Sequence, residues 1–200
     1  EIMPSLVGSE MCIRDRGENA QRYFAKYNKQ KRTFEALTEL IQETADDIQY
    51  LESISNALDI ALSEADLAQI KEELMQSGYI RRKHTKKKVK LTSKPMHYIS
   101  SDGYDMYVGK NNLQNEELTF SFANGNDWWF HAKGAPGSHV IVKSGGDELP
   151  DRTFEEAGRL AAYYSKNRGA DKVEIDYIQK KHVKKPNGAK PGFVVYYTNY

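Results

Sequence analysis

Apolar residues recur with a heptad period over the first third of the chain. From Glu18 onward one position of each heptad and the position three residues later are mostly apolar, and Gln30, Thr44 and Ser55 interrupt the seam. Its apolar members are Tyr27, Phe34, Leu37, Ile41, Ile48, Leu51, Leu58 and Leu62. A repeat of about five heptads predicts a long helix that packs against a partner helix. An ordinary amphipathic helix on a globular core is the alternative, because the seam is imperfect.

A second, shorter helix is predicted directly after the first. Ser63 can cap it, and Asp66 can return the hydrogen bond as in a capping box. Its apolar stripe consists of Leu67, Ile70 and Leu74. We therefore expect a coiled-coil helical arm over residues 17–78. Because the second helix is much shorter than the first, part of the heptad seam must contact something outside this pairing.

From His97 onward the pattern changes to short strands. Asp102-Gly103 lies between two aromatic-rich runs, which predicts a hairpin. Further strands are predicted in the segments LTFSFA, DWWFHAK, SHVIVKS, DKVEIDYI and FVVYYTNY. One helix is predicted from about Thr153 to Lys166, with Thr153 and Glu156 in capping-box spacing. The expected fold class is α+β, with the helical arm followed by a compact mixed α/β domain of mostly antiparallel strands and one main helix.

Two further segments stand apart from these patterns. Residues 1–16 show no helical period and no alternation, and they resemble adapter DNA read as protein, so we leave them out of the expected fold. Residues 79–96 are rich in Lys and Arg without any acid, which predicts a basic linker, either a solvated tether or a phosphate contact. The domain over residues 97–200 ends inside an apolar run, so we expect its C-terminus to be truncated.

The charge is divided unevenly along the chain. The net charge is +1, but residues 1–16, 17–80 and 81–200 have balances of −1, −6 and +8. A basic C-terminal part favours a polyanionic partner, most often nucleic acid. Neither a membrane span nor a secretory leader is recognisable, and the single cysteine, Cys12, allows no disulfide framework. We expect a cytoplasmic protein without membrane contact.

The segment DWWFHAKGAPGSHVIV, residues 127–142, carries the most candidate chemistry. Strand alternation places Asp127, Trp129, His131 and Lys133 on one face and assigns Trp128, Phe130 and Ala132 to the core. If the next strand pairs with it, the exposed face also gains His139 and Lys143. A turn motif is expected at Pro136, Gly137 and Ser138, with Pro136-Gly137 at the centre of a type II turn.

Four interpretations of this face remain open. Two histidines could bind a metal, but no third ligand stands at a characteristic spacing. Ser138 could act as a nucleophile with a histidine, but no G-x-S-x-G turn or orienting carboxylate accompanies it. The histidines could be structural. Finally, the face could bind RNA, with lysines neutralising phosphates, histidines donating hydrogen bonds and Trp129 stacking on a base.

A lysine-rich loop near the end of the chain favours the RNA interpretation over a merely solvated surface. It places five lysines around His182, and Pro-Gly segments at Pro186, Gly188, Pro191 and Gly192 should fix its turns. The lysines are Lys180, Lys181, Lys184, Lys185 and Lys190. No Walker A sequence is present, so nucleotide hydrolysis has no support. We expect no catalytic residue, metal or cofactor.

Several motifs in order resemble the NFACT family. The segments DWWFHAKGAPGSHVIV, AGRLAAYYSKNR and HVKKPNGAKPGFVVY are similar to its RNA-binding NFACT-R domain, and ENAQRYFAKYNKQKR is similar to the start of its coiled-coil segment. The first motif matches at Asp127, Trp129, His131, Lys133, Pro136, Gly137, Ser138 and His139. The second matches at Lys184, Lys185, Pro186, Gly188, Lys190, Pro191 and Gly192.

The resemblance implies a role in ribosome-associated quality control. Members bind an obstructed large ribosomal subunit, hence rRNA, together with tRNA, and bacterial members support alanine tailing of stalled nascent chains. The family's N-terminal and helix-hairpin-helix segments, which carry tRNA selection, have no match here. The resemblance thus implies a non-enzymatic RNA-binding fragment whose coiled coil packs with the missing part or another chain. A fibronectin-binding surface adhesin and an RNA hydrolase using His131 and His139 are the alternatives.

Overall fold

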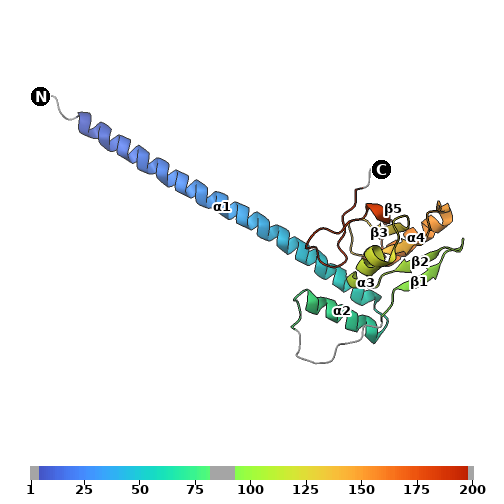
Figure 1. Cartoon of the computed structure of the whole chain (residues 1–200). Helices are drawn as coiled ribbons and strands as arrows, with labels where there is room; N and C mark the ends of the chain where they lie inside the picture. Colours follow the sequence, from blue (N-terminus) through green and yellow to red (C-terminus); the bar gives the residue numbers. More distant parts are fainter. Residues whose placement is uncertain (1–4, 82–92, 198–200) are drawn as a thin grey trace. The chain divides into compact units, whose positions relative to one another are not determined.

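The chain divides between Ile48 and Gln49 into two units. The computed structural model describes residues 5–81 and 93–197, with side chains from residue 15 onward (Figure 1). The first unit is helical, and its helix α1, Ser5–Ile60, continues into the second unit. Most of the predicted basic linker, residues 82–92, lies outside the described residues.

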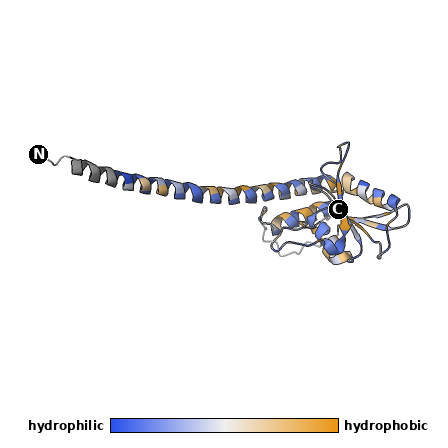
Figure 2. Cartoon of the chain, turned by 90° about the horizontal axis from the view of Figure 1, so that it is seen from above, coloured by the Kyte–Doolittle hydropathy of each residue, from blue (hydrophilic) through white to orange (hydrophobic). Residues whose placement is uncertain are grey.

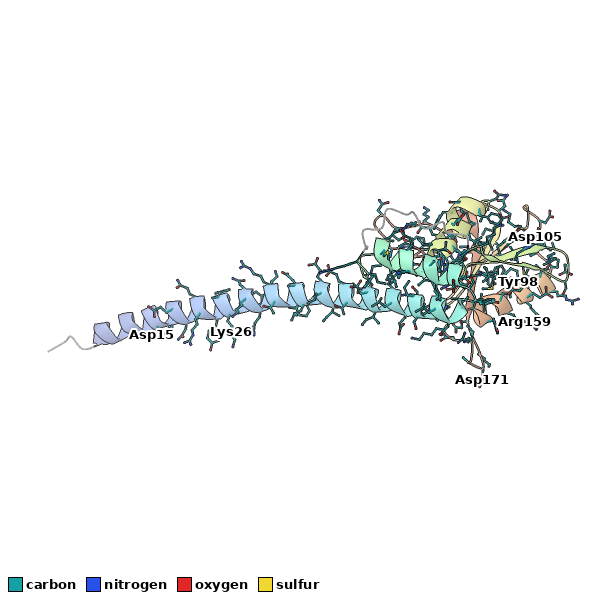
Figure 3. All side chains as sticks on the ribbon, turned by 90° about the horizontal axis from the view of Figure 1, so that it is seen from below. Asp15, Lys26, Tyr98, Asp105, Arg159 and Asp171 are labelled. Carbon is teal, nitrogen blue, oxygen red and sulfur yellow. The ribbon has the colours of Figure 1, made fainter. Side chains whose placement is uncertain are left out.

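The long helix predicted from the heptad pattern is confirmed. It begins at Ser5, within the segment that was left out of the expected fold. From residue 15 to residue 48 every described side chain is exposed, and Phe34, Ile41 and Ile48 are 72%, 68% and 55% exposed. Figure 2 shows hydrophobic and hydrophilic residues alternating along this helix, and Figure 3 shows side chains such as Lys26 projecting from it. The apolar seam of the first unit thus remains uncovered by the described residues.

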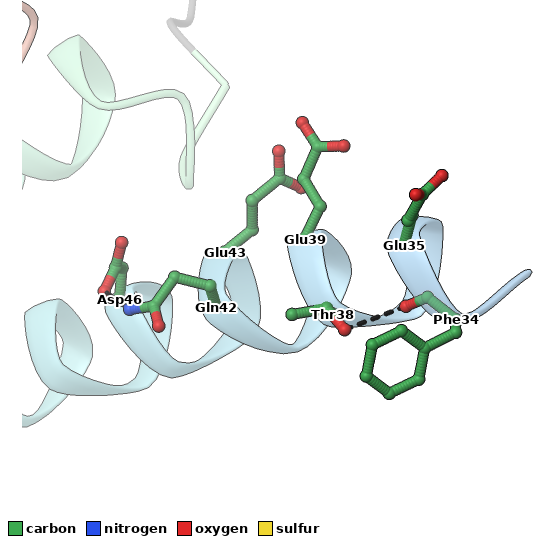
Figure 4. A pocket seen from close by; sticks show the side chains of 7 residues that line it. All are labelled: Phe34, Glu35, Thr38, Glu39, Gln42, Glu43 and Asp46. Carbon is green, nitrogen blue, oxygen red and sulfur yellow. Dashed lines mark hydrogen bonds between the residues drawn. The ribbon is translucent and has the colours of Figure 1, made fainter. Parts of the chain in front are cut away.

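An acidic row runs beside this seam. Glu35, Glu39 and Glu43 follow one another at intervals of one helical turn, and Figure 4 shows their carboxylates on the side of α1 away from the Phe34 ring. The depression drawn there is lined by Phe34, Glu35, Thr38, Glu39, Gln42, Glu43 and Asp46. All seven residues belong to one helix, so the depression has no second wall and is not a candidate binding site.

The predicted second helix is confirmed and forms a hairpin with the end of α1 in the second unit, but the contacting face of α1 differs from the predicted seam. Helix α2, Glu64–Gln76, begins with the expected capping box between Ser63 and Asp66. The core between the helices consists of Tyr50, Ile54, Ala57 and Ile70. The seam residues Leu51 and Leu58 are 43% and 49% exposed, so the predicted seam is wrong here. The physical reason is Tyr50, whose buried hydroxyl is hydrogen-bonded to Glu73 and Ser77 and fixes the contacting face.

The α+β prediction is confirmed by a five-stranded, wholly antiparallel sheet. Its strands are β1 (Met96–Ile99), β2 (Asp105–Val108), β3 (Trp128–Ala132), β4 (Val140–Val142) and β5 (Ile175–Gln179), in the order β1-β2-β4-β3-β5. The predicted turn at Asp102-Gly103 joins β1 to β2, with Gly103 at φ +89° and a hydrogen bond from Gly103 N to Ser100 O. Glycine is favoured there because other residues rarely adopt positive φ.

Each face of the sheet has a buried core at its centre. On one face, helix α4 (Asp151–Tyr163) contributes Ala157 and Ala161 to a core with Phe130, Val140 and other strand residues. The opposite face has its own core, made by Leu118, Ala123, Trp129, Ile141, Ile178 and Val183. The predicted exposed face of the strand at 127–133 is therefore wrong at Asp127 and Trp129, which segments outside the sheet cover, whereas Lys133 is exposed.

Two predicted strands and one predicted cap also have other structures. LTFSFA, residues 118–123, forms the π-helical turn η1 (Leu118–Phe122), which continues directly from helix α3 (Asn112–Glu117). Asn111 starts this helical run by accepting a hydrogen bond from Gln114 N at 2.9 Å. The described part of FVVYYTNY is irregular apart from a bridge between Lys184 and Val195. Helix α4 starts after Pro150, while Thr153 donates to Asp102 at 2.7 Å instead of capping the helix.

Buried polar contacts join α2 to the sheet domain. Asp66 accepts hydrogen bonds from Ser93 and from Lys110 Nζ, the latter at 3.0 Å, and it is fully buried. Burial alone would raise the pKa of Asp66, but the hydrogen bonds from Ser93, Lys110 and the capped backbone outweigh burial and hold that pKa well below its usual range. Asp66 is therefore a charged group that both caps a helix and anchors it.

Replacing Asp66 by alanine should lower the free energy of unfolding by about 3 kcal/mol at neutral pH, since it removes a helix cap and leaves Lys110 without its counter-charge. The folded-state pKa of Asp66 lies below the ordinary value of about 3.9. The difference between the parent and the variant should therefore be complete above that pH and shrink as the pH falls further. Chemical denaturation across this pH range measures both effects.

Asp59→Ala is the matched control for this experiment. Asp59 also faces a basic partner, Arg168 at 3.6 Å, but both side chains are at least half exposed. An exposed pair contributes less than about 1 kcal/mol. Equal losses for the two alanine variants would contradict the anchoring role of Asp66.

Candidate nucleic-acid interface

Four side-chain rings lie close together around Trp129 of β3. The Trp129 ring lies 5.5 Å from that of His131, 5.1 Å from that of His139 and 4.9 Å from that of Tyr196, measured between centroids. The pairing of β3 with β4 thus brings the two predicted histidines together, as expected. Trp129 is completely buried, and its Nε1 has no hydrogen-bond partner among the described residues. Its predicted role as an exposed stacking plane is therefore wrong, because the second core covers it.

Both histidines are held in the neutral form. Burial lowers the pKa of His131 to about 4, although Asp176 on the neighbouring strand opposes the shift. Burial, with a contribution from His131, also holds the pKa of His139 well below its usual range. At neutral pH neither ring can neutralise a phosphate, but each can still donate or accept a hydrogen bond.

His139 is fixed from several sides and is only 2% exposed. Its Nδ1 is hydrogen-bonded to the Thr119 hydroxyl at 2.8 Å, and its backbone N–H donates to Asn115 Oδ1 at 3.0 Å. The ring is thus oriented by a hydroxyl and not by Ser138 or a carboxylate. Within the described part of the chain, no group of three His, Cys, Asp or Glu side chains is placed to hold a metal.

A cavity of about 190 Å³ lies beside the two histidines. Its lining residues come from α1, α3, the loop after β3 and the C-terminal segment: Gln49, Ser53, Asn112, Asn115, His131, Gly134, Ala135, Pro136, Gly137, His139, Gly192, Phe193, Val194 and Tyr196. The two histidines that line this cavity were predicted from the sequence, whereas the two asparagines were not. Asn111, the cap of α3, was the available signal, because a capping residue implies a helix start at this point.

The loop between β3 and β4 differs from the predicted type II turn. Gly134 has a positive φ of +63°, whereas Gly137 does not. Gly137 instead forms a bridge with Ser165, and a Cβ at position 137 would lie 3.1 Å from Ser165 Cβ. Ser138, which is 1% exposed, donates its backbone N–H to Tyr164 O. Gly137 is thus needed for close packing against the end of α4.

Several of the predicted RNA-binding lysines have partners within the chain. Lys143 pairs with the buried Asp127 at 2.5 Å. Lys185 pairs with Glu116 at 2.8 Å. The exposed Lys133 lies 3.3 Å from a carboxylate oxygen of Glu174, Lys180 lies over the Phe120 ring, and Lys190 donates to Tyr79 Oη. Each of these lysines therefore has a structural contact within the chain. A role in RNA binding stays a prediction for each of them.

Lys181 and Lys184 differ from the other lysines of the loop. Both side chains are exposed, and neither takes part in an ion pair within the described residues. Their backbones are nevertheless fixed, because Lys181 N donates to Gly125 O and Lys184 N to Val195 O, each at 2.9 Å. Basic side chains of this kind, exposed and without a carboxylate partner among the described residues, are the type of group that contacts phosphates in nucleic-acid-binding proteins.

The turns predicted for the rest of the loop are present. Ala189 N donates to Pro186 O at 3.2 Å around Gly188, and Phe193 N donates to Lys190 O at 3.3 Å around Gly192. Both glycines have positive φ, +76° and +79°. Pro191 precedes Gly192, the arrangement of a type II turn. The loop is therefore a shaped element and not a loose tail.

The fold and this surface define an α+β domain with a helical arm and a fixed basic loop. Residues 14–93 match the family model described as NFACT N-terminal and middle domains, and residues 94–197 match that of the NFACT protein RNA binding domain. The chain belongs to the NFACT family, which confirms the resemblance seen in the sequence.

The matching proteins are longer than this chain. It is 48% identical over 180 residues to the Rqc2 homolog RqcH of Streptococcus pneumoniae strain D39, covering 90% of this chain and 32% of that protein. The Bacillus subtilis Rqc2 homolog RqcH is 43% identical over 184 residues, with 90% and 31% covered. The chain thus spans about a third of the length of these curated relatives.

A solved structure shares the fold. It is that of the C-terminal part of the fibronectin/fibrinogen-binding protein from Streptococcus suis, with a TM-score of 0.83 and 46% identity, covering 92% of this chain and 73% of that one. In the described part of our chain, no helix has both the length and the apolar character needed to span a membrane.

Gly192→Ala should destabilise the domain by about 2 kcal/mol, because its backbone has positive φ and a Cβ would lie 2.9 Å from Asn112. Gly188→Ala is the matched control, since it has nearly the same φ but open space around the added methyl group, and it should cost about 1 kcal/mol. Thermal and chemical denaturation measure both values. A loss for Gly188→Ala as large as that for Gly192→Ala would contradict the close approach of the loop to α3.

Proposed function

We propose that this chain is a non-catalytic, RNA-binding part of a ribosome-associated quality control factor. It acts in the cytoplasm on the obstructed large ribosomal subunit, contacting rRNA and tRNA. The family match to an RNA-binding domain and the RqcH relatives support the general role. In a full-length protein of this family, the same part would support C-terminal alanine tailing of the stalled nascent chain by holding the factor on its RNA.

The observation that carries the proposal is the exposed, unpaired state of Lys181 and Lys184 on a fixed backbone. The affinity of a lysine for a phosphate is raised by the release of counterions from the RNA. The affinity is highest where the lysine need not first break an ion pair with a carboxylate. Lys185 would have to leave Glu116 before it could contact a phosphate, and Lys143 would have to leave the buried Asp127. The first contacts with RNA therefore fall to Lys181 and Lys184.

The arm has a separate role in this proposal. Its exposed apolar residues, among them Phe34, Leu37 and Ile41, fit a coiled-coil partner helix better than water. That helix would come from another part of a longer protein or from another chain. The acidic row at Glu35, Glu39 and Glu43 disfavours RNA along that side of α1, so electrostatic binding concentrates on the sheet domain.

Replacing Lys181 and Lys184 together by glutamine should weaken binding to large ribosomal subunits and reduce the slope of log affinity against log salt by roughly 2, about 1 for each phosphate contact. Sedimentation or filter binding across a salt series measures both quantities. The double Lys→Arg variant keeps both charges and should retain the parent slope. Lys172→Glu changes a charge on a different exposed loop and should have a smaller effect.

Two results would contradict this prediction. The first is an unchanged salt slope in the double glutamine variant. The second is an equal loss in the double arginine variant, which would show that the shape of these side chains matters and their charge does not.

A second candidate function is fibronectin binding, because the solved relative is the C-terminal part of the fibronectin/fibrinogen-binding protein from Streptococcus suis. It predicts binding to immobilised fibronectin that survives high salt and the double glutamine change. Surface plasmon resonance with the same variants compares the two candidates directly. Fibronectin binding that disappears at the salt concentration which abolishes RNA binding would reduce adhesion to a nonspecific effect of charge.

A further inference from the structure

We propose that the cavity beside His131 and His139 holds a single base turned out of an RNA strand. This inference rests on the proposed RNA-binding function and adds a site to it. The lysines of the loop bind phosphates and have no means of distinguishing bases. The cavity is the described feature with the shape and chemistry to receive one.

The size of the cavity suits one ring system. Its volume of about 190 Å³ is below the range of roughly 300–1,000 Å³ that drug-sized ligands and cofactors occupy. A whole nucleotide would leave its sugar and phosphate outside, which is the arrangement found when single-stranded RNA presents its bases to a protein.

The lining favours a neutral, planar group with polar edges. None of its fourteen residues is Lys, Arg, Asp or Glu, so a charged ligand would lose its hydration without a counter-charge. Phe193 and Tyr196 supply aromatic surface, and the half-buried His131 supplies a neutral ring that can hydrogen-bond to a base edge. His131 is itself supported from behind, because it stacks on Trp129 with an interplanar angle of 20°.

The cavity is a built feature and not a gap between loose segments. Gly192 approaches Asn112 so closely that a Cβ would not fit, which brings the C-terminal wall against α3. Asn112 is held there by hydrogen bonds from its Nδ2 to Ser53 at 2.7 Å and to Glu73 at 2.9 Å. Asn115, one turn further along α3, donates from its Nδ2 to Gly137 O at 3.3 Å and so joins α3 to the loop after β3. Pre-organised walls lower the entropic cost of binding.

The position of the cavity connects it to the phosphate-binding loop. Val194 lines the cavity, and the next residue, Val195, exchanges two backbone hydrogen bonds with Lys184. One of the two exposed, unpaired lysines is therefore fixed to the cavity wall. A phosphate bound by Lys184 would place the adjoining nucleotide near the opening, which favours RNA over an aromatic side chain of a protein partner.

The test uses an RNA hairpin with one bulged 2-aminopurine and the same hairpin with an abasic site at the bulge, each titrated with the full chain. We expect the base-containing hairpin to bind roughly tenfold more tightly, the range that base stacking supplies. The 2-aminopurine fluorescence should also change on binding, because its environment changes from solvent to the cavity.

Gln49→Trp is the decisive variant. Gln49 lies on α1, is exposed and lines the cavity, so a large ring there fills the site without disturbing a buried residue. We expect it to abolish the preference for the base while leaving abasic-hairpin binding and its salt dependence unchanged. Gln42→Trp is the same change at an exposed position of α1 that does not line the cavity, and it should keep the preference.

The outcomes separate this inference from the function on which it rests. Salt-dependent binding with equal affinity for the two hairpins overturns the base site alone. A preference that survives Gln49→Trp overturns it as well, since the base would then bind elsewhere. Binding to neither hairpin, or binding that ignores salt and the Lys181 and Lys184 changes, overturns the proposed RNA-binding function and the base site with it.

Discussion

The docking of helix α2 through two buried carboxylates, Asp66 and Glu73, is the constraint on which the second unit depends. Asp66 binds Lys110 and Ser93, and Glu73 accepts hydrogen bonds from Tyr50 and Asn112. Burial raises the pKa of Glu73 against the effect of these bonds, whereas hydrogen bonds prevail at Asp66. Because each bond requires a particular donor, the hairpin has one way to dock, and apolar contact alone would leave several. Asn112 then forms a wall of the cavity, so the anchor of the fold also positions the candidate site.

The lysine-rich loop has a structural function in addition to its charge. Val183 and, less completely, Val194 and Tyr196 cover the face of the sheet that holds Trp129 and Ile141. Tyr196 also donates to Asp176 on β5 at 2.6 Å. The apolar residues of the segment bury themselves against the sheet, and the lysines between them must then point outward. The loop is thus held in place because it completes a core, and a pre-ordered loop would lower the entropic cost of the proposed phosphate contacts.

Local patterns predicted much of this structure, and long-range contacts account for most of the errors. The long helix α1, the Ser63-Asp66 capping box, the turn at Gly103 and the turns at Gly188 and Gly192 depend on neighbouring residues, and all were predicted. The burial of Trp129 depends on a segment more than fifty residues away, which alternation cannot reveal. Likewise, LTFSFA has the alternation of a strand, but the Asn111 cap and the buried Leu118 make it helical. Ion pairs such as Lys185–Glu116 join distant residues and leave no trace in composition.

Charge and neutrality are separated within the candidate site, and each follows from burial. Lys181 and Lys184 are exposed, whereas His131 and His139 are neutral because burial lowers the pKa of both rings. A protonated histidine beside the cavity would attract phosphate into it and compete with the lysines outside. A neutral histidine instead favours a ligand whose edge carries a matching hydrogen-bond donor or acceptor. The covering of Trp129 therefore removes one stacking surface, and the cavity beside it, whose lining has no Lys, Arg, Asp or Glu, is the one that in our proposal receives a base and excludes a phosphate.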